Sequence, residues 1–226
     1  MDSISNLILF KDHHLLVCNK PSGLPSQPDD TKDKSLFELA EIYSKQKLYI
    51  CNRIDRPVSG LILFAKHKEG AATIQAQFKS PDFSKTYLAL VPISDLPQQG
   101  EFNHWHTVNK NSKKAKIDHS HSEGAIEVTL SYECVEKGDH YQLLMLHTPT
   151  GRFHQIRAQL AFEGLPIRGD VRYGARRANP DRSIGLHSWK LSFLHPANKE
   201  QLHMETPWPM HDIWPHFNKN VSHSPA

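Results

Sequence analysis

The chain has 226 residues, of which 38% are hydrophobic and 23% charged, and its formal net charge at pH 7 is +3. This composition is typical of a globular domain with a sizeable core and excludes a disordered chain. The longest apolar runs, residues 7–10 and 61–65, are far too short to span a membrane, and the first residues lack the pattern of a secretion signal. We therefore expect one compact cytoplasmic body, whose mild basicity permits a nucleic-acid partner without demanding one.

The three cysteines, Cys18, Cys51 and Cys134, include no CxxC pair. This argues against a disulfide framework and against a structural zinc site, so we expect buried, reduced thiols. The chain also contains no GxGxxG or P-loop motif. Nothing in the sequence therefore indicates a metal or a nucleotide cofactor.

Residues 7–19 contain two short apolar runs around a polar KDHH turn, which predicts a hairpin. The Pro- and Gly-punctuated segment KPSGLPSQPDD that follows is expected to be a loop. Residues 35–47 show helical spacing, and Ser35 with Glu38 three residues later predicts a capping box. Next, NRIDRPVSG predicts a polar turn that places Asp55 just before the buried strand GLILFAK.

Further along, the patterns predict a helix over 69–79, strands over 85–93, 126–134 and 141–146, and a helix over 153–162. Residues 100–124 are polar and carry four histidines, so we expect an excursion from the sheet there. Residues 216–226 are expected to be a flexible tail. Because strands outnumber helices and do not alternate with them, we predict an α+β fold on a mixed, largely antiparallel sheet with flanking helices.

Three clusters could carry chemistry. Asp55 is flanked by Arg53 and Arg56, whose charges would keep a nucleophilic or basic carboxylate ionised, although a surface ion-pair turn would show the same pattern. The predicted helix would place His154 and Arg157 on one face, towards a carboxylate from another segment or simply towards solvent. The third cluster is formed by Lys85 and Tyr87, which share one face of a strand and suit base stacking and phosphate contact, or else a core tyrosine beside a snorkelling lysine.

Five segments resemble, in the same order, those of RluA-type pseudouridine synthases, a family that includes RsuA-like and TruC-like enzymes. They are DHHLLVCNKPSGLPSQP, NRIDRPVSGLILFAK, SKTYLALV, TGRFHQIRAQLAFEGLPIRGDVRYG and LHSWKLSFLHP. The resemblance implies the pseudouridine synthase fold around a central RNA-binding cleft, with residues 1–215 as the catalytic domain. It also implies an isomerase that converts a uridine of tRNA or ribosomal RNA to pseudouridine without a metal or cofactor.

The resemblance implies a role for each matching residue. Asp55 would be the catalytic aspartate, Arg157 its ion-pair partner and Tyr87 the aromatic against the flipped uracil. Arg53 would hold the target nucleotide out of the stack, and Ile156 would pack beside the base. Candidate RNA contacts, chosen by charge and proximity to the motifs, are Lys20, Arg56, Lys85, His154, Arg168 and Arg172.

The sequence departs from the family pattern in two ways. Asn52 stands where histidine is common, and Arg56-Pro57-Val58 replaces the usual Arg-Asp/Glu-Thr; we interpret both as tuning of the loop. We also expect no S4 RNA-binding module, a monomer, no obligate protein partner, and site selection by the catalytic domain alone.

Two other functions fit part of the sequence. Sixteen histidines, several between His104 and His121, suggest a metal-dependent hydrolase or deaminase, but the cysteine pair of zinc deaminases is missing. A non-catalytic RNA-binding protein on the same scaffold is the second alternative, and the joint presence of Asp55, Tyr87 and Arg157 argues against it.

Overall fold

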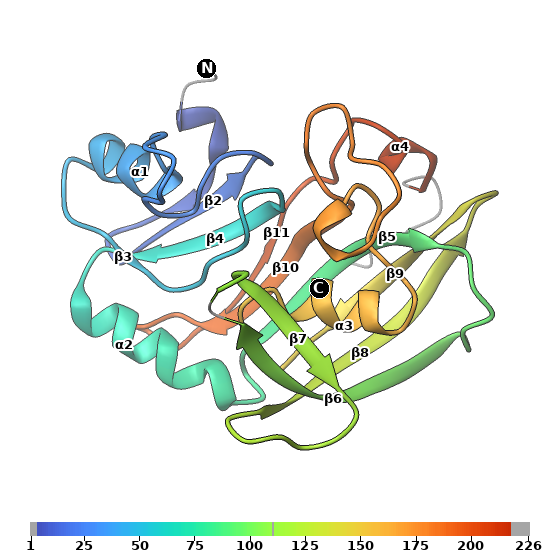
Figure 1. Ribbon diagram of the computed structural model, residues 1–226. Coiled ribbons are helices and arrows are strands. Elements are labelled where there is room, and N and C mark those ends of the chain that lie inside the picture. The colour runs from blue at the N-terminus through green and yellow to red at the C-terminus, as the bar shows by residue number, and fades with distance from the viewer. Residues whose placement is uncertain (1–3, 110, 218–226) are drawn as a thin grey trace. The chain divides into compact units, whose positions relative to one another are not determined.

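A computed structural model of the protein describes residues 4–109 and 111–217 (Figure 1). The chain forms two compact units. The first takes in the described residues up to Lys85 together with His187–Trp208, and the second takes in Thr86–Leu186 and the described residues from Pro209 onward. Each unit is built on β-strands and is described by itself.

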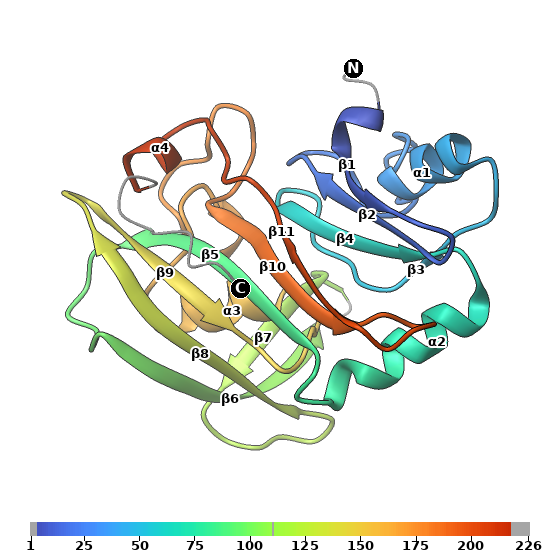
Figure 2. The ribbon, with the colours of Figure 1, turned by 180° about the vertical axis from the view of Figure 1, so that it is seen from behind.

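The first unit is a mixed arrangement of strands with one parallel pairing. Its strands are β1 (Ile8–Lys11), β2 (Leu15–Lys20), β3 (Tyr49–Ile50), β4 (Ser59–Ala65), β10 (Leu186–Leu194) and β11 (Gln201–Glu205). β1 and β2 form the predicted hairpin, and β2 pairs antiparallel with β4 from Leu15↔Ala65 to Lys20↔Gly60. On its other side β4 pairs in parallel with β10, and β10 pairs antiparallel with β11 (Figure 2).

The helical elements of this unit are η1 (Ile4–Leu7), α1 (Leu36–Ser44), α2 (Lys68–Ala76) and η2 (Gln77–Lys79). The predicted capping box is present at α1: the Glu38 amide donates to Ser35 Oγ at 3.3 Å, and the Ser35 amide donates to Glu38 Oε2 at 2.8 Å. From α2, Ala71 and Ile74 pack with the buried side chains of β4. The helix at 68–76 is therefore held by its apolar face.

Gly60 is required where β10 meets β4. Its φ is +117°, and a Cβ at this position would overlap the backbone oxygen of Ser188, its neighbour in the parallel pairing. Only glycine combines this backbone conformation with such a close approach. The start of β4, shortly after Asp55, is thereby fixed against β10.

The second unit is an antiparallel series in the order β5-β9-β8-β6-β7. These strands are β5 (Ser84–Pro92), β6 (Gln99–Asn109), β7 (Lys114–Asp118), β8 (Ile126–Lys137) and β9 (Tyr141–His147). The helices are α3 (Gln155–Phe162), η3 (Val171–Tyr173) and α4 (Trp214–Phe217). Ala158 of α3 packs with Ala115, Ile117 and Val128 of β7 and β8, so this helix covers part of the series.

The prediction that residues 100–124 leave the sheet is wrong, because β6 and β7 occupy most of this segment. Phe102, His104 and His106 alternate along β6 and are buried. His104 bonds Glu163 at 2.7 Å, and His106 bonds the Phe153 carbonyl oxygen at 2.9 Å. The inward-facing positions of β6 are thus partly filled by histidines whose ring nitrogens have hydrogen-bond partners. Because histidine is polar, the alternation of buried and exposed residues could not be recognised from hydrophobicity.

The predicted helix over 153–162 begins two residues late, at Gln155. His154 precedes it with a left-handed backbone (φ 52°), and Phe153 is 45% exposed. His154 therefore does not share a helix face with Arg157, and Phe153 does not join the buried face.

The predicted tail overlaps α4 at residues 216 and 217, and its remaining residues lie outside the described part of the chain. The three cysteines are buried and free, as predicted. Among the described residues, every helix is too short or too polar to traverse a lipid bilayer. The predicted α+β class on a mixed, largely antiparallel sheet is confirmed by the pairings within the units.

Candidate active site

Asp55 lies in a turn between β3 and β4, residues 52–58, called here the Asp55 turn. The Val58 amide donates to the Asp55 carbonyl oxygen at 3.0 Å, which closes the turn over Arg56 and Pro57. The side chain of Asn52 fixes the start of the turn: its Nδ2 donates to the Leu61 carbonyl at 3.1 Å, and its Oδ1 accepts from the Leu63 amide at 2.7 Å. The asparagine in place of the usual histidine thus docks the turn on the backbone of β4.

A second segment, residues 21–33, holds the turn from the other side and is called the retaining loop. Ser26 Oγ donates to the Ile54 carbonyl at 2.6 Å, so the residue before Asp55 is anchored. The Gly23 amide donates to the Arg56 carbonyl at 2.9 Å, which anchors the residue after it. The Asp55 backbone is therefore positioned through both of its chain neighbours.

Lys20, predicted as a phosphate contact, is fully buried between the Asp55 turn and the retaining loop. Its Nζ donates to the carbonyl oxygens of Pro21 at 3.0 Å, Leu24 at 2.8 Å and Arg56 at 3.1 Å. Burial lowers the pKa of Lys20 to about 7; the Asp55 charge opposes this shift and the Arg56 charge adds to it. The prediction that Lys20 contacts an RNA phosphate is therefore wrong. Its buried ammonium group instead joins the Asp55 turn to the retaining loop through three carbonyl oxygens.

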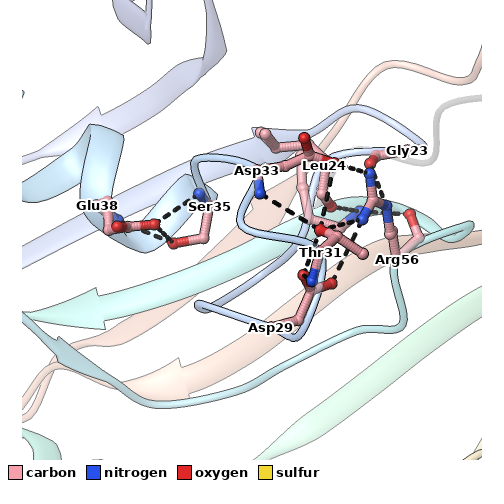
Figure 3. Close-up of polar contacts among 9 residues, drawn as sticks. Gly23, Leu24, Asp29, Thr31, Asp33, Ser35, Glu38 and Arg56 are labelled. Carbon is pink, nitrogen blue, oxygen red and sulfur yellow. Dashed lines mark hydrogen bonds and ion pairs between the residues drawn. The ribbon is translucent and has the colours of Figure 1, made fainter.

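The two arginines beside Asp55 also reach the retaining loop. Arg56 Nε donates to the Gly23 carbonyl at 2.8 Å, and its Nη1 donates to Thr31 Oγ1 at 2.7 Å. Arg56 further pairs with two carboxylates of this loop, Asp29 and Asp33 (Figure 3). Arg53 Nη1 donates to Gln27 Oε1 at 3.1 Å. The guanidinium groups that flank Asp55 in sequence therefore tie its turn to the neighbouring loop.

In the second unit, Arg157 is 5% exposed and paired with Asp170, which is 2% exposed. Arg157 Nε donates to Asp170 Oδ2 at 2.7 Å and Nη2 donates to Oδ1 at 2.9 Å, a two-pronged geometry that fixes the guanidinium plane. The guanidinium carbon lies 5.0 Å from the ring centroid of Tyr173, and the Tyr173 hydroxyl bonds His154 Nδ1 at 2.9 Å. His154 and Arg157 thus meet through Tyr173 and not along a helix.

Asp170 and Tyr173 were not predicted as site residues, although both lie in the segment IRGDVRYG that carries the family resemblance. Ser26 and the acidic residues of the retaining loop were not predicted either, because they follow no periodic pattern. The one sequence signal for Asp170, Tyr173 and Ser26 is their place within motifs of the family. Only the fold shows which partner each one has.

The other predicted site residues are well packed. Tyr87 and Ile156 are 8% and 7% exposed, respectively. Burial lowers the pKa of Lys85 to about 8, and its Nζ lies 5.8 Å and 5.9 Å from the ring centroids of Phe78 and Phe83.

Two more predicted RNA contacts have internal partners. Arg168 donates to Asp212 at 2.5 Å and 2.7 Å, and Arg172 donates to the Ser112 carbonyl at 2.8 Å. Since Asp55 belongs to the first unit and Tyr87, Ile156 and Arg157 belong to the second, the ion pair between Asp55 and Arg157 stays a prediction. Within residues 4–109 and 111–217, no three His, Cys, Asp or Glu side chains are grouped so as to hold a metal ion.

Solved structures with a similar fold define the class. The structure of human RNA pseudouridylate synthase domain containing 4 matches with a TM-score of 0.76 and 25% identity, over 95% of this chain and 92% of that one. The structure of human RNA pseudouridylate synthase domain containing 1 matches in fold with a TM-score of 0.74 over 88% of this chain and 82% of that one. The fold is therefore that of pseudouridine synthases.

A family model described as RNA pseudouridylate synthase matches residues 14–162, and the chain belongs to this family. It is 32% identical over 218 residues to a ribosomal large subunit pseudouridine synthase C of Vibrio vulnificus, with 92% of this chain and 64% of the relative covered. It is 30% identical over 205 residues to an RNA pseudouridine synthase of Mycoplasma genitalium described as uncharacterized, with coverages of 88% and 66%. The chain thus spans slightly less than two thirds of the length of these relatives.

Proposed function

We propose that the protein is an RNA pseudouridine synthase in which Asp55 is the attacking carboxylate. The observation that carries the proposal is the anchoring of Ile54 and Arg56, the neighbours of Asp55, by Ser26, Gly23 and Lys20. Asp55 itself is only partly buried. A partly exposed carboxylate on a fixed backbone suits nucleophilic attack, which needs a positioned group that a substrate can reach.

The reaction requires the target uridine to leave its stack. Extrusion costs a few kcal/mol, and stacking on Tyr87, at about 1–3 kcal/mol for a base on an aromatic ring, together with phosphate contacts would offset this cost. We assign Arg53 to holding the extruded nucleotide and Ile156 to packing beside the base. We assign Arg157, whose guanidinium plane is fixed by its two bonds to Asp170, as the positive group that faces Asp55 in the working enzyme.

In the chemical step, the Asp55 carboxylate attacks either C1′ of the ribose or C6 of the uracil. The bond between C1′ and N1 breaks, the base rotates, and C5 forms a new bond to C1′. The bond that the carboxylate made to C1′ or C6 then breaks, with its electron pair returning to the carboxylate, so Asp55 is regenerated. The hydrogen at C5 leaves as a proton and N1 takes up a proton, so the product is an isomer and no electrons are exchanged. These steps require positioning and one carboxylate, without a cofactor.

We propose structured RNA in the cytoplasm as the substrate and a monomer as the working form. Several similar relatives are named for the ribosomal large subunit, which makes ribosomal RNA the first substrate to test. Transfer RNA is the second, as the resemblance to TruC-like enzymes suggests.

The test is tritium release from RNA that carries 5-tritiated uridine, with ribosomal RNA and tRNA assayed separately. Wild type and the control Asp95→Asn, which changes an exposed carboxylate, are expected to release tritium from one RNA class. Asp55→Asn is expected to lower the rate by about 10³-fold or more while RNA binding persists. Binding without release by wild type would favour the non-catalytic RNA-binding alternative.

A further inference from the structure

A pocket of about 570 Å³ lies in the first unit, at the end of β2 and β4 opposite to Asp55. It is lined by Lys11, Asp12, His13, Leu16, Tyr43, Ser44 and Lys66. These residues come from the β1–β2 hairpin, the last turn of α1 and the residue after β4. None of them has a part in the proposed reaction, and we call this site the hairpin pocket.

The lining of the hairpin pocket is positively charged. Lys11 Nζ donates to the Tyr43 hydroxyl at 2.8 Å, and Lys66 Nζ donates to the backbone oxygen of Asp12. The single carboxylate of the lining, that of Asp12, accepts from the His14 amide at 2.7 Å and the Leu15 amide at 2.6 Å and bonds His195 at 2.9 Å. Because this carboxylate is bonded within the hairpin and to His195, the residue after β10, the two ammonium groups dominate the charge of the pocket.

The hairpin pocket lies at a fixed distance from Asp55. The Asp55 turn leads into the first residue of β4, and Lys66 follows its last residue. At about 3.3 Å per residue, the seven residues of β4 separate the two sites by roughly 20 Å or more. The pairing of β2 with β4 along its whole length makes this spacing rigid.

We propose that the hairpin pocket binds a phosphate of the RNA backbone several nucleotides away from the target uridine. Lys11 and Lys66 contact the phosphate oxygens, and the hydroxyl of Tyr43, which accepts from Lys11, donates to the phosphate or the adjacent ribose. The inference rests on the proposed function, because an RNA substrate carries phosphates at a regular spacing and can bridge both sites. Besides Asp12, His13 and the aliphatic Leu16, the lining consists of two cations and two hydroxyl-bearing side chains, which suits this ligand.

The test compares Lys11→Gln/Lys66→Gln with the control Lys137→Gln/Lys199→Gln. The control removes the same charge from two exposed lysines outside the pocket, each of which also donates to a backbone carbonyl. Fluorescence anisotropy over a range of salt concentrations gives Kd for the RNA class that releases tritium. The pocket variant is expected to bind about tenfold more weakly at 0.1 M salt, and its slope of log Kd against log salt is expected to fall by about one for each phosphate that it no longer binds.

Further measurements make the result decisive. Tritium release by the pocket variant should fall more at limiting RNA than at saturating RNA, because a higher RNA concentration compensates for weaker binding. Lys11→Arg/Lys66→Arg should restore binding, which separates a charge effect from damage to the hairpin, and thermal melting checks the fold. Wild-type affinity and salt slope in the glutamine variant would overturn the proposal and leave the pocket to another partner, such as an acidic protein. If wild type releases no tritium, the proposed function fails, whereas the same binding comparison on bulk RNA still decides the role of the pocket.

Discussion

The two units hold their charged site residues by different means. In the first, Asp55 is partly exposed, and its chain neighbours are bonded to Lys20, Gly23 and Ser26. In the second, Arg157 is almost fully buried and is held directly by its carboxylate partner Asp170. Under the proposed function, Asp55 must meet a substrate and is positioned through its backbone, whereas the buried charge of Arg157 is balanced by a counter-charge. Four predictions, made for three substitutions, test this contrast.

The largest effect is expected for Asp170→Asn. Removing one partner of a buried ion pair leaves an uncompensated charge, and we expect a loss of about 3–5 kcal/mol in the free energy of unfolding. Urea denaturation measures it. Asp170→Asn/Arg157→Met should recover much of the loss, since the orphaned charge is removed as well. A loss below about 1 kcal/mol for the single variant would mean that the buried guanidinium group finds another partner.

The next largest effect is expected for Lys20→Met, which removes one donor from each of three carbonyl oxygens. The Arg56 carbonyl keeps the Gly23 amide as a donor, whereas those of Pro21 and Leu24 lose the bond from Lys20. At about 1–3 kcal/mol for an unsatisfied buried group, and with partial relaxation, we expect a loss of about 3 kcal/mol. Because the Arg56 carbonyl is one of the three, kcat for tritium release should also fall at temperatures where the variant is fully folded. Stability loss with an unchanged kcat would show that Lys20 supports the fold and not the placement of Asp55.

The pH dependence of stability tests Lys20 more finely. Burial lowers its pKa to about 7, so between about pH 7 and pH 10 the unfolded chain keeps this proton while the folded protein has lost it. Stability conferred by this residue therefore rises with pH across that window. The difference in unfolding free energy between wild type and Lys20→Met should grow by up to about 1.4 kcal/mol per pH unit. A difference in unfolding free energy that does not change with pH would indicate that Lys20 keeps its proton in the folded protein, stabilised by its carbonyl partners.

The smallest effect is expected for Arg56→Gln. Its ion pairs with Asp29 and Asp33 are solvent-exposed, so they should change the melting temperature little. The turn loses ties to the retaining loop, however, and we expect kcat to fall by about threefold to tenfold. High salt should reduce the difference in kcat between wild type and Arg56→Gln, because salt screens the exposed ion pairs that wild type makes. A difference in kcat that does not depend on salt would show that the hydrogen bonds from Arg56 to Gly23 and Thr31 cause the loss, and not its ion pairs.

Much of the first unit was predictable because local signals and tertiary packing agree there. The hairpin of β1 and β2, the capping box of Ser35 and Glu38 and the strand after Asp55 all follow from short-range patterns. The position of Asp55 at the mouth of a buried strand follows from the contrast between a charged turn and an apolar run. The α+β class followed from the irregular succession of strands and helices.

The positions of buried polar residues could not be predicted from the sequence. His104 and His106 line an inward face of β6, and Lys20 is fully buried on loop carbonyls, so composition suggested exposure in both cases. The partner of Arg157 within its own unit, Asp170, lies thirteen residues away and was selected by packing. The left-handed backbone of His154 arises where a loop enters α3, and helical periodicity carries no signal for it.

The approach of Ser188 to Gly60 also has a consequence for the order of folding. The first unit is discontinuous: the strand that flanks the start of β4 lies more than a hundred residues downstream in the chain, and its Leu191 and Phe193 belong to the same core as Leu61 and Leu63. Contacts of such long sequence separation form late. During synthesis, the Asp55 turn therefore exists before the strand that fixes the base of β4, and it reaches its final form only after β10 has been made.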